Sequence, residues 1–377
     1  MKNSETQIIL IGNYPKDNQE SMIRFSEMLK EGFRELNFIC NIWVPMVFFG
    51  NLSKSTNHGI GKWLGYLDKY ILFPVILRIR TLFYNSKSTI YHICDHSNVI
   101  YLPYILGEKK GVTCHDVLAI RGALGYSDAH CDATYFGKIL QKWILRNLEK
   151  AERVAAVSES TLNQLGGLIK LDEAKKRTVI YNSFNAKFHR IPNELVQERL
   201  LPFHLNDKPF ILHVGSALPR KNRELLLKMV AELGNNWDGV ICYAGEALEE
   251  ELLALAIKLN LKDRVISVVK PNHKNLLALY SGCEAFIFPS FSEGFGWPVI
   301  EAQSCGVPVI SSSVEPMREI SGGASINIHP QDVKGFAETF IKLKDSTFRN
   351  QIIGKGYDNI KRFDPVLMIN NYLDLYR

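Results

Sequence analysis

The chain is predicted to be an α/β protein with two parallel sheets, because strand-like and helical stretches alternate along it twice. Its 377 residues are enough for two domains of ordinary size. Apolar strand-like runs are expected at 8–11, 38–44, 89–93, 112–115, 154–157 and 179–181, and again at 210–214, 239–243, 265–269, 285–288 and 308–311. Helices are expected at 19–36, 134–150, 159–169, 224–232, 248–259, 275–281 and 298–305. This alternation is typical of parallel sheets with helices on both faces.

Each set of strands and helices is expected to form one Rossmann-like domain. The first domain is predicted to span residues 1–195 and the second 196–363, with the polar, proline-containing stretch 190–209 as the linker. In open sheets of this kind, ligands bind near the carboxyl ends of the strands. Functional residues are therefore expected in the loops that follow the strands.

The composition fits a soluble enzyme of a reducing compartment. Hydrophobic residues make up 46% of the chain, which is enough for sizeable cores. The seven cysteines include no Cys-x-x-Cys pair, and their odd number does not suit a disulfide framework. No apolar signal core precedes the first strand. We expect a cytoplasmic protein.

Positive charge is concentrated in the first half of the chain. Residues 1–195 carry 25 Lys and Arg against 18 Asp and Glu, whereas residues 196–377 carry 20 against 21. This imbalance indicates an acidic partner for the first domain, either an anionic membrane surface or a phosphate-linked acceptor. Ordinary surface lysines are the alternative. Nucleic acid is not expected, since no basic helix with interleaved aromatic residues is recognisable.

The segment 62–84 is apolar, aromatic and interrupted by basic residues. Its longest uncharged run, 70–77, is too short to span a bilayer. A helix packed on its own sheet is the favoured interpretation. The alternative is an interfacial amphipathic helix in peripheral contact with the inner face of a membrane.

One glycine-rich loop and the helix after it carry two carboxylates eight residues apart, Glu293 and Glu301. Pro298 marks the helix start, because proline is favoured in the first helical turn. Gly294 and Gly296 let the loop backbone approach a ligand closely, and the N–H groups of a helix N-terminus suit a phosphate. Glu301 can accept hydrogen bonds from vicinal hydroxyls, and Glu293 from a second polyhydroxyl group. The pattern predicts a site for a sugar joined to a nucleotide through phosphate.

The run Ser292-Glu-Gly-Phe-Gly-Trp-Pro-Val-Ile-Glu-Ala302 resembles the signature of the retaining glycosyltransferases of family 4. Two further runs resemble segments of that family, Ser304-Cys-Gly-Val-Pro-Val-Ile310 and His213-Val-Gly-Ser-Ala-Leu-Pro-Arg-Lys-Asn222. The resemblance is specific over residues 209–345 and weaker over 1–190. It implies the GT-B fold, in which two Rossmann-like domains face each other across a central cleft. It also implies that the final helix, 364–377, crosses back onto the first domain.

No catalytic metal is expected, because the chain contains no Asp-x-Asp pair. An NAD enzyme is also disfavoured, since the first strand is not followed by Gly-x-Gly-x-x-Gly. Protein side chains must then neutralise the charge on a leaving phosphate, and Arg220 and Lys221 are placed by the sequence to do so. The resemblance implies that Lys221 binds the diphosphate. Ser216 stands where the family often has an arginine, and Arg220 is expected to substitute for it.

The resemblance also implies roles for residues at the strand ends of the first domain. His115 is expected to contact the donor sugar or the acceptor and position it, with general base as the second role. Gly12 and Asn13 lie where the family has a glycine-rich loop near the diphosphate. The run Asp95-His96-Ser97-Asn98 is expected either to line the acceptor cleft or to form a turn between strands.

In the second domain, the resemblance implies that Glu301 holds the ribose and Glu293 the sugar hydroxyls. The base is expected against the loop near Lys270. The residues expected to contact the nucleotide sugar are Ser216, Lys270, Pro271, Glu293, Gly294, Phe295, Gly296 and Glu301.

The expected activity is retaining, metal-independent transfer of a hexose from a nucleotide-diphosphate sugar to a glycan or lipid-linked oligosaccharide in polysaccharide biosynthesis. UDP-glucose is the first expected donor and GDP-mannose the second. The leaving phosphate oxygen is expected to help deprotonate the acceptor on the same face of the sugar. Two alternatives stay open: an epimerase or phosphorylase on the same fold, and a non-catalytic subunit that binds nucleotide sugars.

Overall fold

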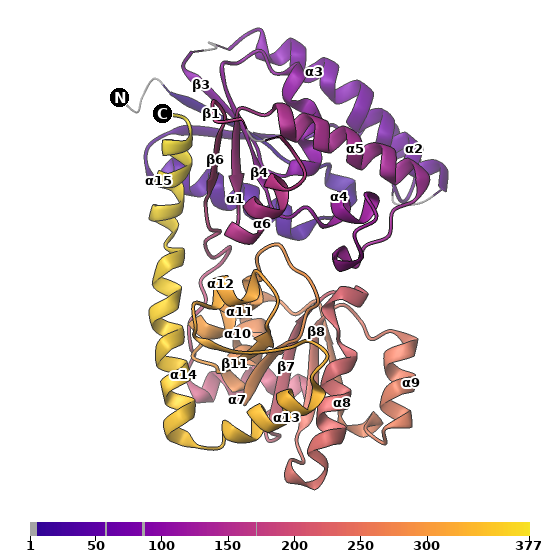
Figure 1. The fold of residues 1–377 in the computed structure, drawn as a ribbon, viewed down its shortest axis with the longest axis vertical. Helices are drawn as coiled ribbons and strands as arrows, with labels where there is room; N and C mark the ends of the chain where they lie inside the picture. The colour runs from indigo at the N-terminus through magenta and orange to yellow at the C-terminus, as the bar shows by residue number, and fades with distance from the viewer. Residues whose placement is uncertain (1–5, 57–58, 85–86, 171) are drawn as a thin grey trace. The chain divides into compact units, whose positions relative to one another are not determined.

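The computed structural model describes residues 6–56, 59–84, 87–170 and 172–377. The chain forms two compact units. Unit 1 comprises Met1–Leu124, Ala133–Asn185 and Pro365–Arg377, and unit 2 comprises Gly125–Asp132 and Ala186–Asp364. Each unit contains one parallel sheet covered by helices (Figure 1), which confirms the predicted α/β class.

The sheet of unit 1 has six parallel strands in the order β2-β1-β3-β4-β5-β6. The strands are β1 (Gln7–Ile11), β2 (Ile39–Trp43), β3 (Thr89–Ile93), β4 (Lys109–Cys114), β5 (Arg153–Ala156) and β6 (Lys176–Val179). The central strands β1 and β3 are continuous, largely apolar runs because helices cover both of their faces. The strand order reverses between β1 and β3, so the loops after these two strands flank the crevice at which such sheets bind ligands.

The helices of unit 1 are α1 (Glu20–Glu35), α2 (Gly59–Leu67), α3 (Phe73–Thr81), α4 (Leu118–Ala123), α5 (Tyr135–Lys150), α6 (Glu159–Gly166) and α15 (Pro365–Leu375). A π-helical turn, Asp68–Leu72, joins α2 to α3 so that residues 59–81 form one helical segment.

Helix α15 comes from the end of the chain and is held to β3 and β4 by a buried polar network. The Tyr376 hydroxyl lies 2.6 Å from His92 Nδ1, and the Tyr372 hydroxyl lies 2.9 Å from Thr113 Oγ1. His92 Nε2 lies 2.7 Å from the same Thr113 hydroxyl, which links the two contacts. Because every member has a partner, the network can be buried without leaving an orphaned polar group.

The sheet of unit 2 has six parallel strands in the order β12-β11-β10-β7-β8-β9. The strands are β7 (Phe210–Gly215), β8 (Val240–Gly245), β9 (Val265–Val269), β10 (Ala285–Phe288), β11 (Val309–Ser312) and β12 (Ser325–Ile328). Counted from its first strand, this is the 3-2-1-4-5-6 order of doubly wound sheets. The order reverses between β7 and β10.

The helices of unit 2 are α7 (Asn193–Leu200), α8 (Glu224–Leu233), α9 (Glu250–Lys258), α10 (His273–Gly282), α11 (Trp297–Ser304), α12 (Met317–Ser321), α13 (Val333–Lys342) and α14 (Ser346–Asn359). Successive strand residues point to opposite faces of the sheet. Leu212 and Phe286 accordingly belong to one apolar cluster, whereas Ile211 and Ile287 belong to another. Unit 2 therefore has two cores, one beneath each layer of helices.

The structure differs from the sequence predictions at the linker, at the division into units and at two strands. The stretch 190–209 is not an extended linker, because it carries α7, whose Val196 and Leu200 are buried in the core of unit 2. The boundary between the units lies at Asn185 and Ala186 rather than after residue 195, and Gly125–Asp132, predicted in the first domain, belongs to unit 2. Strand β6 begins at Lys176, three residues before the predicted run, and β12 was not predicted. Among the described helices, none is long and apolar enough to cross a membrane.

Candidate functional site

The crevice of unit 2 lies where the strand order reverses, between the loops that follow β7 and β10. The loop after β7 contains a 3₁₀ turn, Pro219–Lys221, which presents two cations in succession. The loop after β10 leads through Glu293 to the N-terminus of α11. The backbone joins the two loops directly, since Phe291 N–H donates to the Arg220 carbonyl at 2.8 Å. The fold thus brings together residues separated by about seventy positions in the chain.

Glu293 forms an ion pair with both cations of the opposite loop. Lys221 Nζ lies 2.6 Å from its Oε1, and Arg220 Nη1 lies 2.9 Å from its Oε2. The Arg220 guanidinium also donates to the Ser292 carbonyl at 2.9 Å. The Glu293 and Lys221 side chains are at most one tenth exposed. The three predicted residues therefore form one cluster with a net charge of plus one, in which Glu293 and Lys221 are buried and Arg220 is 22% exposed.

The pKa of Glu293 lies below its ordinary value. Burial raises this pKa, but the charges of Lys221 and Arg220 and the hydrogen bond from Lys221 together lower it by more. The carboxyl is therefore ionised at neutral pH. It cannot donate a proton there, and its charge is already shared between two cations.

Asn222 fixes the conformation of the loop that carries the two cations. Its backbone has φ of 52°, a left-handed conformation that asparagine tolerates better than most residues. Its side-chain amide donates to the carbonyls of Pro289 and Pro330, at 3.1 and 2.7 Å. These bonds hold the turn against the end of β10. The positions of Arg220 and Lys221 are thereby set before any ligand arrives.

Glu301 lies in the second turn of α11 and is buried. The Tyr280 hydroxyl of α10 donates to its Oε2 at 2.8 Å. Helix α11 starts at Trp297 with Pro298 in its first turn, one residue earlier than predicted. Gly296 precedes it with φ of 97°, and a Cβ there would lie 2.5 Å from Met317 Cε, so only glycine fits.

The remaining predicted residues of unit 2 lie at the same carboxyl edge of the sheet. Ser216 follows β7 directly, and Lys270 and Pro271 follow β9. Lys270 has φ of 46°, and its N–H donates to the Gly245 carbonyl at 2.8 Å. Strand β9 lies two strands from β7, so the two loops are roughly 10 Å apart.

Two members of the signature loop are available to a ligand mainly through their backbone. The Phe295 side chain is buried, with its ring centroid 5.8 Å from that of Trp297 and 5.7 Å from that of Phe363. Gly294 has no side chain. Any contact that these residues make to a sugar is therefore expected from the main chain.

A cavity of about 550 Å³ opens at the carboxyl ends of β7 and β8. Its wall includes Pro219 and Asn222, which flank Arg220 and Lys221 in the chain, but none of the predicted site residues. The cavity therefore lies beside the charged cluster rather than around it. Among the described residues, no group of three or more His, Cys, Asp and Glu side chains is arranged to hold a metal ion.

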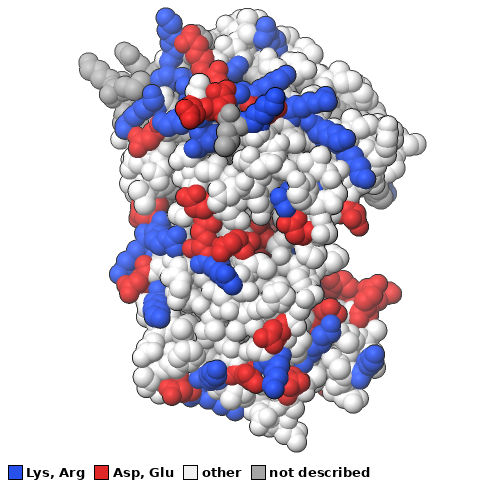
Figure 2. Space-filling model, viewed as in Figure 1, with Lys and Arg blue, Asp and Glu red and all other residues white. Residues whose placement is uncertain are grey.

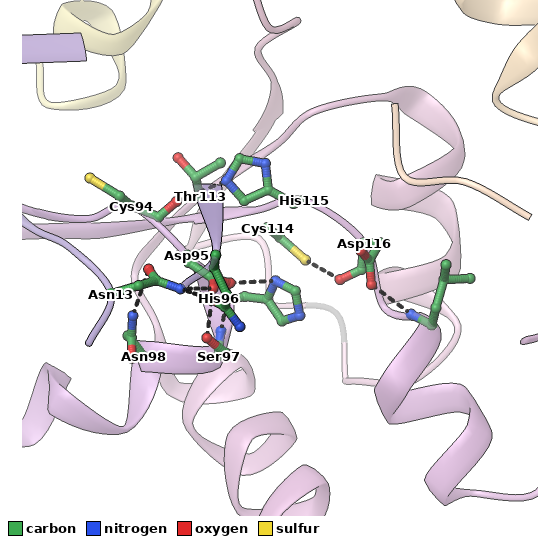
Figure 3. A network of polar contacts seen from close by, with 12 residues as sticks. Asn13, Cys94, Asp95, His96, Ser97, Asn98, Thr113, Cys114, His115 and Asp116 are labelled. Carbon is green, nitrogen blue, oxygen red and sulfur yellow. Dashed lines mark hydrogen bonds and ion pairs between the residues drawn. The ribbon is translucent and has the colours of Figure 1, made fainter. Parts of the chain in front are cut away.

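The crevice of unit 1 is built on hydrogen bonds to Asp95, which follows β3. Asn13, after β1, donates to its Oδ2 at 2.6 Å, and the Ser97 hydroxyl donates to the same oxygen at 2.7 Å. The Ser97 N–H donates to Oδ1 at 3.0 Å, which caps a 3₁₀ helix, and His96 Nδ1 lies 3.3 Å from that oxygen. Asn98 donates to Asn13 at 3.0 Å. Figure 3 shows these side chains grouped around Asp95.

The pKa of Asp95 lies below its ordinary value. Burial raises it, but the neighbouring imidazoles of His96 and His115 and the bonds from Ser97 lower it by more. Gly12 precedes Asn13, and its N–H donates to the Trp43 carbonyl at 2.9 Å, which extends the sheet by one bond. The predicted turn at residues 95–98 is thus present as a helix cap.

His115 follows β4 and is buried in unit 1. Its Nε2 lies 2.8 Å from the Cys94 carbonyl, so this nitrogen carries the proton and donates it. Its ring stands edge-on to Phe25, with centroids 4.5 Å apart. Burial lowers the pKa of His115, and the nearby Asp95 carboxylate offsets only part of that lowering. The imidazole is therefore neutral at pH 7, with Nε2 as its donor and Nδ1 as its acceptor nitrogen. The bond from Nε2 fixes the orientation of the ring.

Several polar groups near the unit 2 crevice were not singled out from the sequence. Tyr280 holds Glu301 from a different helix, and no local pattern reveals that contact. The hydroxyls of Ser292 and Ser312 are buried with no hydrogen-bond partner among the described residues. Ser292 follows the apolar strand β10, and Ser312 ends the apolar strand β11. This position at a strand end is the one sequence signal that could have pointed to them. A buried hydroxyl without a partner is a group that a ligand can satisfy.

Comparison with known proteins gives one family match. Residues 201–359 match the family model described as glycosyl transferases group 1. This region contains β7–β12 of unit 2 and every site residue predicted there.

Similar proteins extend the match over most of the chain. Over 353 residues the chain is 25% identical to the O-antigen chain mannosyltransferase RfbU of Salmonella typhimurium, covering 92% of this chain and 88% of that protein. Over 333 residues it is 24% identical to O-antigen chain mannosyltransferase B of Escherichia coli, covering 85% and 83%. The structure of a sucrose-phosphate synthase from Thermosynechococcus elongatus superposes with a TM-score of 0.74 at 20% identity, covering 99% of this chain and 98% of that one. At that identity the structural likeness shows the fold.

Proposed function

We propose that the chain is a glycosyl transferase of group 1, because residues 201–359 match that family's model and two relatives that cover most of the chain are mannosyltransferases. We further propose that it transfers a hexose from a nucleotide-diphosphate sugar with retention of configuration and without a metal. The bond between the anomeric carbon and the β-phosphate oxygen breaks. An acceptor hydroxyl oxygen bonds to the anomeric carbon from the same face, and its proton passes to the departing phosphate oxygen. Atoms and charge balance without a further reactant.

The observation that carries this proposal is the cluster of Arg220, Lys221 and Glu293. Negative charge develops on phosphate oxygens as the glycosidic bond breaks, and fixed cations in a water-poor site stabilise it strongly. Lys221 and Arg220 supply two such cations on one preformed turn. Their shared carboxylate reduces but does not cancel their charge, so the cluster retains an attraction for an anion.

The state of Glu293 supports a route without a covalent intermediate. Each of its carboxylate oxygens is held by a cation, and its lowered pKa keeps it ionised. An ionised group is no proton donor, and a carboxylate neutralised by two cations is a weak nucleophile. We assign it to sugar hydroxyls and to positive charge that develops at the anomeric carbon. Glu301, held by Tyr280, is assigned to the ribose.

For the donor we propose GDP-mannose, with UDP-glucose as the alternative. The sequence alone placed UDP-glucose first. Two relatives that match more than four fifths of this chain are described as O-antigen chain mannosyltransferases, and this reverses the order. For the acceptor we propose a glycan or a lipid-linked oligosaccharide of a growing polysaccharide. We place the reaction in the cytoplasm, because all seven cysteines are free thiols and six are buried, as suits a reducing compartment.

The test is a transfer assay in EDTA with GDP-mannose and UDP-glucose as separate donors and alkyl mannosides as acceptors. We expect release of GDP, with a product that keeps the anomeric configuration of the donor by NMR. Inverted product would overturn the proposed stereochemistry. Conversion of the donor to another nucleotide sugar would indicate an epimerase, and phosphate-dependent cleavage of a glycan a phosphorylase. Tight nucleotide binding with no turnover on any acceptor would indicate a non-catalytic subunit.

A further inference from the structure

The helical segment 59–81 of unit 1 has an exposed apolar face as well as a buried one. Gly61, Gly65, Phe73 and Leu77 are buried on the inner side. Its outer side exposes large apolar residues down its whole length and just beyond: Ile60, Trp63, Ile71, Val75, Ile79, Leu82 and Phe83. Ile60 and Phe83, at the two ends, are 81% and 82% exposed. The segment is about 35 Å long. The inner face therefore fits the prediction of a helix packed on its own sheet. The outer face fits the alternative, an interfacial amphipathic helix.

Helix α5 adds a second exposed apolar stripe beside the first. Phe136, Ile139 and Trp143 are spaced by three and four positions, so they share one face of α5, and all three are exposed. The stripes meet at two ring contacts, Trp63 with Phe136 and Tyr70 with Trp143, each with centroids 5.8 Å apart. A hollow of about 430 Å³ between α2 and the start of α5 is lined by Trp63, Tyr66 and Phe136. The two helices therefore form one continuous aromatic surface.

The exposed charges on the two stripes are basic. Exposed basic residues interrupt both stripes: Lys62, Arg78 and Arg80 on the first, and Lys138, Lys142 and Arg146 on α5. Residues 59–84 contain one acidic residue, Asp68, and α5 contains one, Glu149, which lies in its last turn and outside the stripe of Phe136, Ile139 and Trp143. Figure 2 shows a row of Lys and Arg side chains over this part of unit 1. An aromatic surface with a mainly basic fringe is typical of segments that lie in the interface of an anionic bilayer.

The single acidic residue of the segment is turned inward. Asp68 is fully buried and accepts bonds from the Tyr14 hydroxyl at 2.7 Å and from the N–H groups of Phe48, Phe49 and Gly50 at 3.1, 2.9 and 2.9 Å. These bonds lower its pKa by more than burial raises it, so it is ionised. Asp68 therefore tethers the segment to the loops after β1 and β2 and leaves the outer face without negative charge.

We infer that the outer face of α2, α3 and α5 binds the surface of an anionic lipid bilayer, with the aromatic stripes at the level of the headgroups. This inference goes beyond the proposed function and does not depend on it, because lipid binding by unit 1 can be measured without donor or turnover. The charge of the surface selects this occupant over a second copy of the chain, since two copies would bring like charges together. A soluble glycan stacks the C–H faces of its sugar rings on aromatic side chains, but a neutral glycan offers no partner for the exposed aliphatic residues Ile71, Val75 and Ile79 or for the basic fringe.

The test is binding of the full chain to vesicles made from equal parts of phosphatidylcholine and phosphatidylglycerol, measured by co-sedimentation. We expect binding at about 0.1 M salt that weakens strongly near 1 M salt, where the Debye length is about 3 Å. Vesicles of phosphatidylcholine alone should bind far less. Lys138→Gln with Lys142→Gln should weaken binding about fivefold for each lysine, the factor that corresponds to about 1 kcal/mol. Trp63→Ser with Phe136→Ser should weaken it about tenfold, since both rings lose their insertion into the interface.

Matched controls come from unit 2. Lys334→Gln with Lys355→Gln, and Leu253→Ser with Ile257→Ser on α9, change exposed residues of the same kinds and should leave vesicle binding unchanged. Circular dichroism spectra and thermal unfolding curves should stay the same in all four variants, which verifies that both units fold. If the variant with Trp63 and Phe136 replaced does not fold, the variant with Lys138 and Lys142 replaced still tests the inference. Equal binding to both kinds of vesicle, no binding to either, or losses as large in the controls would each overturn the inference. So would light scattering that shows a dimer dissociated by the same substitutions.

Discussion

The two units share a doubly wound sheet but equip its crevice differently. In unit 2 the loops on either side of the strand reversal are joined by an ion pair, Lys221 Nζ to Glu293 Oε1 at 2.6 Å. In unit 1 the equivalent loops, after β1 and β3, are joined by an amide–carboxylate hydrogen bond, Asn13 Nδ2 to Asp95 Oδ2, also at 2.6 Å. The same position in the fold is thus cationic in one unit and anionic or neutral in the other.

This difference separates two kinds of ligand. Fixed cations in a buried site favour a phosphate, whereas an ionised carboxylate with neighbouring amides favours the hydroxyls of a sugar. From this contrast we propose that the nucleotide-sugar donor binds unit 2 and that the acceptor binds unit 1. The exposed surfaces follow the same division, since the basic aromatic stripes of α2, α3 and α5 all belong to unit 1.

The largest expected effect distinguishes the carboxylate of Glu293 in unit 2 from that of Asp95 in unit 1. Glu293→Gln should lower turnover about 100-fold or more, the usual result of removing a preorganised electrostatic group, while GDP affinity changes less than tenfold. Asp95→Asn should raise the KM for the acceptor and leave GDP affinity unchanged. Steady-state kinetics combined with calorimetry measures both.

Glu338→Gln is the control for these two variants, because Glu338 is exposed in unit 2 and pairs only loosely with Lys334, at 3.8 Å. It should change neither quantity. If Asp95→Asn altered GDP affinity as much as Glu293→Gln did, the division of donor and acceptor between the units would not hold.

A smaller effect is expected at Glu301. If its carboxylate holds the ribose, Glu301→Gln should weaken GDP binding about tenfold, and Tyr280→Phe, which removes one bond to that carboxylate, about threefold. The sharper measurement compares GDP with 2′-deoxy-GDP by calorimetry. Wild type should prefer GDP, and Glu301→Gln should lose most of that preference. An undiminished preference in the variant would assign the ribose contact to other residues.

A further expected effect concerns acid stability rather than activity. Burial lowers the pKa of His92 in unit 1 and of His213 in unit 2 to about 3, and His115 in unit 1 is also lowered. Below the unfolded value of about 6.5, the unfolded chain binds protons that these buried imidazoles do not, so stability falls as pH decreases. Each fully neutral histidine contributes up to about 1.4 kcal/mol per pH unit between about 6.5 and its folded pKa. The lowered pKa of Glu293 also stabilises the folded state, and this stabilisation is lost only as the pH falls below about 4.3.

Denaturant unfolding of wild type and His92→Gln from pH 7 to pH 5 measures this slope. The variant should be less stable at pH 7, because it loses two buried contacts, but the gap should narrow as the pH falls. His189→Gln, at an exposed position, should run parallel to wild type. A gap of constant size would mean that His92 is not the titrating group.

Much of the fold follows from the sequence because the central strands are buried on both faces and are therefore largely apolar. The strands that were misplaced or missed, β6 and β12, are both at sheet edges. There one side is open, and polar residues such as Lys176 and Asn327 replace the apolar signal. The helix at 193–200 was missed for a related reason, since its polar residues outnumber the buried Val196 and Leu200.

The candidate site could be predicted where it depends on a local spacing but not where it depends on contacts across the fold. Glu293, Glu301 and Lys221 could be read from two short runs. The bond from Tyr280 to Glu301 and that from Asn13 to Asp95 join residues that no local pattern relates. Spacing also gave no sign that Glu293 bridges the same two cations expected to bind phosphate.

The most direct test of the central claim is calorimetric titration of GDP and UDP in EDTA into wild type, Lys221→Met and Lys228→Met. Lys228 is an exposed lysine of α8 that pairs with Glu224, so it is the matched control. We expect one nucleotide to bind wild type and Lys228→Met equally without metal, and Lys221→Met to bind it at least tenfold more weakly. Equal affinity in all three proteins, or binding that appears only when a divalent metal is added, would contradict the assignment of the diphosphate to this cluster.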